Sequence, residues 1–305
     1  MELKEALHGW VLKGGALKPV NWGCASGGQA RTVVKLYAAR PAPPPVFQFK
    51  ISPGPAPAGD RLYNLFHRMY AYPSIRGTGV ELDWGDGKTI TINAPNSFNQ
   101  PVHFYDDETR EYIVTLRNLD GLTGVRVAEN GYLTEILTPI PRAENSALQN
   151  FADKCGNLKK IPENLLGAGV SAGADRLTSA FYACAALTML PPDLLKGAGG
   201  VRQFNNAFAG CAGLTEIPAG FFDGCVSAEV MFCVFMNCAG LKSIPPGLFA
   251  NLPGITDFTG AFLGCSGITG PVPRLWNSHP GAEHVQTFLG CVNASNYDEI
   301  PAGWK

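Results

Sequence analysis

The cysteines of this 305-residue chain could carry the most chemistry, because thiolates bind metals, form disulfides and act as nucleophiles. Six of the nine cysteines follow one another at intervals of 29, 27, 27, 27 and 26 residues. These six are Cys155, Cys184, Cys211, Cys238, Cys265 and Cys291, and the others are Cys24, Cys225 and Cys233. The intervals are too long for the Cys-x₂-Cys pairs of zinc sites. A column of buried free thiols is the favoured interpretation, and a metal or disulfide ladder is the alternative.

Two carboxylates, Asp83 and Asp86, lie in a glycine-rich turn and form a second candidate site. Carboxylate oxygens are ligands that Ca²⁺ prefers, but such residues more often cap turns by accepting backbone N–H bonds. Both interpretations stay open. The five histidines form no H-E-x-x-H motif, and the chain has no P-loop, dinucleotide fingerprint or G-x-S-x-G elbow. We therefore expect a protein that is not an enzyme, with no catalytic residue, no metal and no cofactor.

The regular cysteines belong to a sequence repeat of about 27 residues, in which Phe precedes Cys and L-x-x-I-P follows. One such unit cannot bury its apolar side alone, but stacked units share a continuous core. The segment before each Cys predicts a short helix, and L-x-x-I predicts a brief strand that the Pro ends. The predicted core residues are Phe181, Cys184, Leu187, Phe208, Cys211, Leu214, Ile217, Phe235, Cys238, Leu241, Ile244, Phe262 and Cys265.

The two middle residues of each L-x-x-I segment are the candidates for binding a partner. They straddle the pleat of the predicted strand, so at least one of the two faces solvent. An ordinary surface without a partner is the alternative. The candidates are Lys159, Lys160, Thr188, Met189, Thr215, Glu216, Lys242 and Ser243.

The part before the repeats alternates apolar and polar residues, which is typical of strands. Strands are predicted at 46–51 and 112–116, and a hairpin at 80–92 turns at Asp86-Gly87. A short helix is predicted at 62–69, where apolar residues recur at helical spacing.

Composition and proline content predict the outline of the chain. The net charge of −1 with 16 % charged residues argues against a nucleic-acid binder, and no apolar run approaches the ~18 residues of a membrane span. Prolines cluster at 41–45 and predict a stiff linker. We expect an N-terminal attachment segment with the linker at 1–45, a β domain at 46–128 and a solenoid of about six units at 129–305. A partly ordered tail is the alternative for the N-terminal segment.

Two sets of motifs resemble known families. The phrases FAGCAGLTEIPAGFF and FMNCAGLKSIPPGLF resemble the leucine-rich repeats of the BspA-like type, over about residues 146–305. That resemblance implies a curved α/β solenoid that binds a partner, as in bacterial surface proteins and some phage tail proteins. The phrases LDWGDG and YIVTL resemble a PKD-type immunoglobulin-like domain over about residues 46–128, which implies a β-sandwich. The expected fold is therefore a β-sandwich followed by an α/β leucine-rich-repeat solenoid.

These modules imply a phage or prophage tail protein, a tail fibre or receptor-binding component that presents the solenoid to a host surface. The start of the sequence does not resemble a secretory signal, so we expect a virion protein that is assembled in the host cytoplasm. The implied partners are a host cell-surface receptor, protein or glycan, and other tail or baseplate proteins that meet the N-terminal segment. A homotrimer is one implied assembly. The alternatives are a bacterial cell-surface adhesin and an intracellular protein-binding scaffold.

Overall fold

The computed structural model describes residues 8–13, 16–21, 45–55, 62, 65, 67–140, 148–166 and 175–305. The chain divides into two compact units, Met1–Pro43 and Pro44–Lys305. In the first unit, β1 (His8–Lys13) and β2 (Ala16–Asn21) pair as an antiparallel hairpin. Most of the expected attachment segment lies outside the described residues, and so do residues 63, 64 and 66 of the helix predicted at 62–69.

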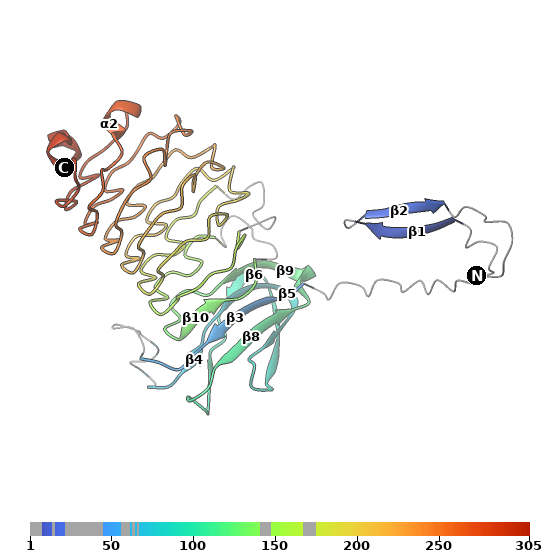
Figure 1. Ribbon diagram of the computed structural model, residues 1–305. Helices are drawn as coiled ribbons and strands as arrows, with labels where there is room; N and C mark the ends of the chain where they lie inside the picture. The colour runs from blue at the N-terminus through green and yellow to red at the C-terminus, as the bar shows by residue number, and fades with distance from the viewer. Residues whose placement is uncertain are drawn as a thin grey trace, which may run out of the picture. The chain divides into compact units, whose positions relative to one another are not determined.

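The second unit begins with an antiparallel sheet, in which the strand order is β10-β3-β8-β5-β6 and β9 also pairs with β5 (Figure 1). A separate short ribbon pairs β4 (Tyr70–Ala71) with β7 (His103–Phe104), and the 3₁₀ turn η2 (Leu119–Gly121) precedes β9. The strands of the main sheet are β3 (Phe47–Ile51), β5 (Ser74–Asp83), β6 (Thr89–Asn99), β8 (Tyr112–Arg117), β9 (Leu122–Arg126) and β10 (Leu133–Ile136).

The strands predicted in this part of the chain are confirmed. Strand β3 buries every second residue, as alternation requires, and β8 buries Tyr112, Val114 and Leu116. The predicted hairpin is β5 and β6, which pair from Asp83 opposite Thr89. The sheet also includes β10, which lies beyond the boundary that we expected at residue 128 and pairs with β3.

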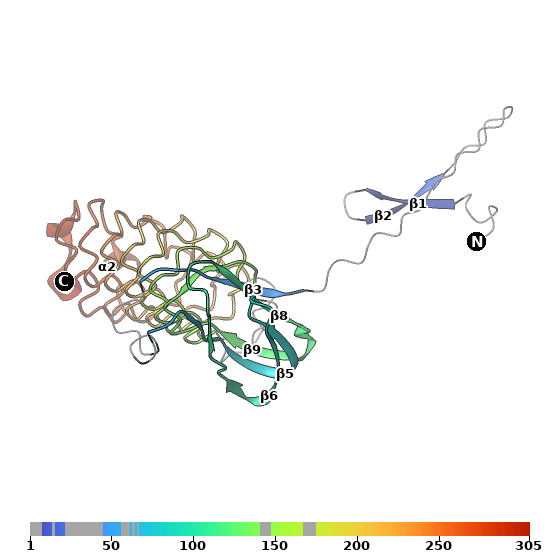
Figure 2. The ribbon, with the colours of Figure 1, turned by 90° about the horizontal axis from the view of Figure 1, so that it is seen from below.

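Residues 148–166 and 175–305 form a stack of coils that continues from the sheet (Figures 1 and 2). Neighbouring coils are joined by one parallel β-bridge each. In every one of these coils, the bridging residue lies eight positions before the coil's own repeat cysteine. These bridges join Arg176, Gln203, Val230, Asp257 and Glu283 in succession. The first coil joins the sheet in the same manner, because Lys160 pairs in parallel with Glu135 of β10.

The prediction of an α/β solenoid is wrong. The segments before the cysteines are successive turns, and no strand is assigned to the L-x-x-I segments. Among the described residues from 148 onward, the only α-helix is the four-residue α2 (Leu275–Ser278), which the 3₁₀ turns η4 (Tyr297–Glu299) and η5 (Ala302–Trp304) accompany. A stack of turns is therefore added to a mostly antiparallel β domain.

Left-handed backbone explains why helices do not form. In each coil, the residue five positions before the cysteine and the residue directly before it have positive φ, as Ser179 (φ 53°) and Ala183 (φ 57°) illustrate. A right-handed helix cannot contain such residues. The equivalent pairs are Asn150 and Lys154, Asn206 and Gly210, Cys233 and Asn237, Gly260 and Gly264, and Gln286 and Gly290.

This backbone gives each coil two alternating sets of hydrogen bonds. One set closes tight turns within the coil, such as Ala180 N–H to the Leu177 carbonyl (3.1 Å). The other set joins coils, and each of its N–H groups donates to a carbonyl of the following coil. In the coil of Cys184, these donors are Leu177, Ser179, Phe181 and Ala183, and the acceptors are Gln203, Asn205, Ala207 and Ala209.

A file of aromatic rings runs through the core of the stack. The rings of Phe181 and Phe208 stack with centroids 5.6 Å apart, and those of Phe208 and Phe235 stack at 5.4 Å. The file starts in the sheet, where Phe47 meets Phe151 at 6.4 Å. All the predicted core residues are buried, with none more than 4 % exposed.

The repeat cysteines lie beside this file with free, buried thiols. From Cys184 onward, each Sγ donates to a backbone carbonyl of the preceding coil, as Cys211 does to Phe181 (3.2 Å) and Cys238 to Phe208 (3.2 Å). Packing and a directional bond therefore both fix the position of the thiol.

Candidate functional site

The predicted contact residues form one surface along the stack. All eight are exposed. We call this set, Lys159, Lys160, Thr188, Met189, Thr215, Glu216, Lys242 and Ser243, the coil face. Backbone bonds between coils hold it in register: Thr215 N–H donates to the Thr188 carbonyl (3.1 Å), and Lys242 N–H donates to the Thr215 carbonyl (3.0 Å).

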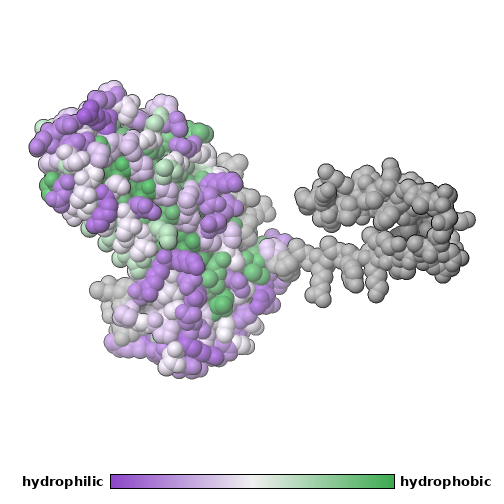
Figure 3. All heavy atoms as spheres, in the orientation of Figure 1, coloured by the Kyte–Doolittle hydropathy of each residue, from purple (hydrophilic) through white to green (hydrophobic). Residues whose placement is uncertain are grey.

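The coil face continues onto the sheet. Lys159 N–H donates to the Thr134 carbonyl of β10 (2.9 Å). Glu135 of the same strand forms a parallel backbone β-bridge with Lys160. Glu135 also pairs with Lys50 (2.8 Å), so charges of both signs line this junction. On the side of the second unit that Figure 3 presents, hydrophilic and hydrophobic residues are interspersed. The arrangement can form hydrogen bonds and ion pairs with a broad polar target.

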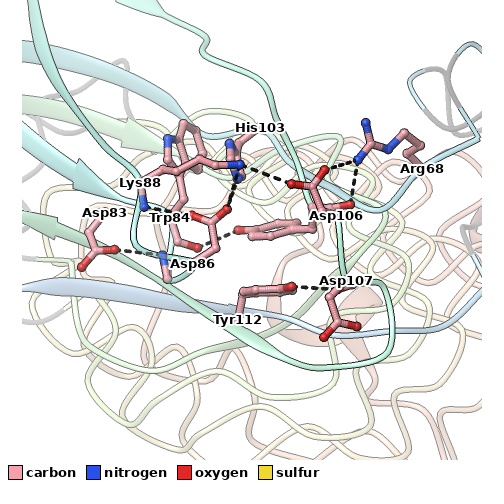
Figure 4. A network of polar contacts seen from close by, with 11 residues as sticks. Arg68, Asp83, Trp84, Asp86, Lys88, His103, Asp106, Asp107 and Tyr112 are labelled. Carbon is pink, nitrogen blue, oxygen red and sulfur yellow. Dashed lines mark hydrogen bonds and ion pairs between the residues drawn. The ribbon is translucent and has the colours of Figure 1, made fainter.

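A second cluster lies at the tip of the β5–β6 hairpin (Figure 4). Asp83 Oδ1 accepts the Gly85 N–H (2.9 Å), and Asp86 Oδ1 accepts the Lys88 N–H (3.1 Å). The turn-capping interpretation of these two carboxylates is therefore confirmed. Their remaining oxygens accept from side chains: Arg117 donates to Asp83 Oδ2 at 2.9 Å, and His103 Nε2 lies 2.8 Å from Asp86 Oδ2.

Three aromatic rings pack in and beside this cluster. Two of them contact His103, and the third stacks on one of those two. The His103 ring stacks on Trp84 (4.9 Å) and meets the edge of Tyr105 (4.9 Å). The Tyr105 hydroxyl donates to the Trp84 carbonyl (3.0 Å), and its ring stacks on Tyr112 (3.9 Å). The sequence predicts no role for His103, because it lies 17 residues from Asp86 and no motif contains both residues.

Burial and hydrogen bonding act in opposite directions on Asp86. Burial disfavours the carboxylate, but the hydrogen bonds from His103 and the Lys88 backbone outweigh it, so the pKa of Asp86 lies below its usual 3.8. Burial, and then the Asp86 charge, raise the pKa of Tyr105. The side chains of Asp86 and His103 are 11 % and 12 % exposed. The cluster is therefore a cross-link between the hairpin tip and β7.

A ring of ion pairs covers the outer side of this cross-link. Lys88 Nζ lies 3.4 Å from Asp86 and 3.5 Å from Asp106, and Arg68 pairs with Asp106 at 2.9 Å (Figure 4). These pairs tie the chain before β4 and the chain after β7 to the hairpin tip. Arg68, Lys88 and Asp106 are exposed, so we attribute the cohesion of the cluster mainly to the part-buried contact of Asp86 with His103.

The repeat thiols are held in the unreactive form. Burial raises the pKa of Cys211 to about 12, and it raises the pKa of Cys184 and Cys238 well above 9.0. The thiolate is the form that attacks electrophiles and binds metals. In the described part of the chain, no group of three or more His, Cys, Asp or Glu side chains is placed to hold a metal ion. These cysteines serve packing.

No protein-family model matches the chain, and no curated protein matches it. Within the described ranges, no helix combines the length and the apolar character that a membrane span requires.

Proposed function

We propose that the protein is a non-catalytic recognition protein whose stacked coils present the coil face to a macromolecular surface. The coil face carries this proposal, because its eight exposed side chains lie in register above a continuous buried core. Side chains on a rigid scaffold lose little conformational entropy on binding, which favours affinity. Stacked repeats provide extended binding surfaces of this kind in other proteins.

The proposed target is the surface of a bacterial host cell, with the protein acting as a tail fibre or receptor-binding component of a phage or prophage. The repeat and hairpin motifs favour this assignment by their resemblance to modules of such proteins. A bacterial adhesin and an intracellular scaffold are the alternatives. Mass spectrometry of purified virions, induced from the strain that encodes the chain, should detect it; virions without it would overturn the tail assignment.

Charge reversal on the coil face tests the recognition proposal. The double variant Glu216→Lys with Lys242→Glu keeps the net charge but reverses two exposed positions of neighbouring coils. Fluorescently labelled protein is titrated on a panel of intact bacterial strains. We expect at least a tenfold loss of affinity for the strain that the unmodified protein binds, with an unchanged melting temperature.

The matched control is Glu163→Lys with Lys196→Glu, which exchanges the same charges at exposed positions outside the coil face. This control should bind cells as the unmodified protein does. Equal losses in both double variants would show that the coil face is not the contact surface. Binding of the unmodified protein to no strain would overturn the cell-surface target.

A further inference from the structure

A pocket of about 410 Å³ spans three neighbouring coils of the stack, those of Cys238, Cys265 and Cys291. Its volume is within the usual range of small-molecule pockets, about 300–1,000 Å³. Each of the three coils contributes to the lining, which consists of Pro246, the run from Pro271 to Arg274, and Ser295, Asn296 and Glu299.

The pocket continues the coil face. In every coil, the coil-face positions are the fourth and fifth after the repeat cysteine, and in the coil of Cys291 these are Ser295 and Asn296. Ser295 N–H donates to the Gly270 carbonyl (3.3 Å), and Gly270 N–H donates to the Lys242 carbonyl (3.4 Å). The backbone bonds that hold the coil face in register therefore reach the pocket, and a ligand on the coil face can extend into it.

The polar side chains of the pocket offer both donors and acceptors. Asn296 accepts the Val272 N–H (2.9 Å) and donates to the Val272 carbonyl (3.0 Å), which fixes its amide and uses one of the two Nδ2 hydrogens. The Ser295 hydroxyl forms no hydrogen bond with any described residue. Arg274 pairs with Glu299, and a guanidinium carries five N–H donors, so further donors remain for a ligand.

The charges of the lining cancel. Arg274 and Glu299 are the only ionisable residues among those that line the pocket in the described part of the chain, and they form an ion pair. An anionic ligand would have to compete with Glu299, and a cationic ligand with Arg274. A neutral ligand with hydroxyl groups can bond to both side chains without separating them, because a hydroxyl both donates and accepts.

Proline rings form the apolar part of the lining. Pro246 and Pro271 are exposed, and Val272 and Pro273 are buried. The ring of proline fixes φ, so this apolar surface keeps its shape without a ligand. A sugar ring matches such a lining, because its C–H groups can contact the prolines while its hydroxyls bond to the polar side chains.

A row of hydroxyl groups leads along the coil face to the pocket. The fourth position after the cysteine is an exposed Thr or Ser in four of the six coils, namely Thr188, Thr215, Thr269 and Ser295. The coils are about as far apart as successive sugars of an extended polysaccharide, since the Phe235 and Phe262 rings stack at 5.7 Å. A periodic row of this kind favours a periodic, hydroxyl-rich polymer over a protein, whose side chains differ from residue to residue.

We propose that the pocket binds one neutral sugar residue of a bacterial surface polysaccharide, and that the neighbouring sugars lie along the coil face. Arg274 and Asn296 donate to hydroxyls of the bound sugar, Glu299 accepts from them, and the prolines contact its C–H face. This inference rests on the proposed function, because it names the class of target that the coil face recognises.

The test uses immobilised bacterial surface polysaccharides, one set neutral and one set rich in uronic acids, titrated with the fluorescently labelled full chain. We expect at least one neutral polysaccharide to bind at least tenfold more tightly than every uronic-acid polymer. Ser295→Trp places a large ring at an exposed position of the pocket and should abolish this binding without changing the melting temperature. Tighter binding of the uronic-acid polymers, or binding of no neutral polysaccharide, would overturn the inference.

A double variant locates the binding. Arg274→Ala with Glu299→Ala keeps the net charge and should reduce affinity for the neutral polysaccharide at least tenfold. The matched control is Arg202→Ala with Glu229→Ala, which removes an equally exposed ion pair between coils that does not line the pocket. This control should bind normally, and equal losses in the two double variants would show that the pocket is not the site.

The cell titration separates this inference from the proposed function. If Glu216→Lys with Lys242→Glu weakens cell binding while no neutral polysaccharide binds, the sugar pocket alone is overturned. If the unmodified protein binds neither any strain nor any polysaccharide, both proposals are overturned.

Discussion

The β domain and the coil stack place neighbouring chain segments side by side in different ways. In the β domain, antiparallel strands pair over several residues, and the part-buried contact of Asp86 with His103 ties the hairpin tip to β7. In the stack, neighbouring coils share one bridge, a row of backbone bonds with one direction, and a file of aromatic rings. The first region depends on contacts between distant residues, and the second on contacts between adjacent repeats.

Removing one ring of the aromatic file should have the largest effect. Phe208 is 1 % exposed and stacks on Phe181 and Phe235, so Phe208→Ala should lower the free energy of unfolding by about 3–5 kcal/mol. Urea denaturation followed by circular dichroism measures it. The control Phe232→Ala removes a ring that is 37 % exposed and should cost about 1 kcal/mol or less. Similar costs for the two variants would mean that the file does not stabilise the stack.

Close approach between coils gives the second test. A Cβ at Gly213 would lie 2.6 Å from the Ala185 carbonyl oxygen of the preceding coil. Because that neighbour is backbone, Gly213→Ala should cost about 1–3 kcal/mol in thermal or urea unfolding. At Gly247 the nearest atom, a side-chain carbon of Ala250, is 3.9 Å away, so Gly247→Ala should be close to neutral. Two neutral substitutions would contradict the tight spacing of the coils.

Alkaline pH should weaken the stack through its thiols. The pKa of Cys211 is about 12 in the folded protein and ordinarily 9.0, so above pH 9 the unfolded chain loses its proton first and stability falls. The stabilising contribution is complete below pH 9. Cys211→Ser should therefore lose less stability than the unmodified protein between about pH 8 and about pH 10, by roughly 1 kcal/mol. Parallel alkaline slopes in the two proteins would contradict burial of this thiol.

Acid should act on the β domain instead, with the smallest effect. The pKa of Asp86 is lowered in the folded protein, so its contribution is present above 3.8 and is lost as the pH falls through the lower folded value. Asp86→Asn should cost about 1 kcal/mol at neutral pH and flatten the acid side of a melting-temperature profile. Asp120→Asn, at an exposed carboxylate of the same domain outside this cluster, should leave the profile unchanged. Identical profiles for Asp86→Asn and the unmodified protein would mean that the Asp86–His103 contact adds no stability.

Much of the β domain and of the stacked core was predictable from sequence, because the relevant patterns are local or strictly periodic. Alternation identifies β3 and β8, the Asp86-Gly87 turn identifies the hairpin, and the 27-residue period identifies residues that become buried. The helix prediction failed because apolar spacing before each Cys fits a helix and a series of turns equally well. Left-handed φ at non-glycine positions such as Ser179 and Ala183 arises from bonds to the next coil, which a single repeat does not reveal.

The part of the candidate site that follows the periodic repeat was predictable from sequence. Exposure of the coil face follows from its position between buried residues of the repeat. The contact of Asp86 with His103 depends on how separate segments meet, so no local pattern predicts it.

The continuous aromatic file has a consequence for how such a chain changes over generations. It runs from Phe47 in the sheet to Trp304, and each interior ring meets an equivalent ring above and below. If one whole unit were duplicated or lost, each Phe ring at the junction would still stack on an equivalent Phe ring of its new neighbour. The reach of the molecule can thus lengthen or shorten in fixed steps of about 5 Å, one strand spacing per unit, while the parts at either end stay as they are.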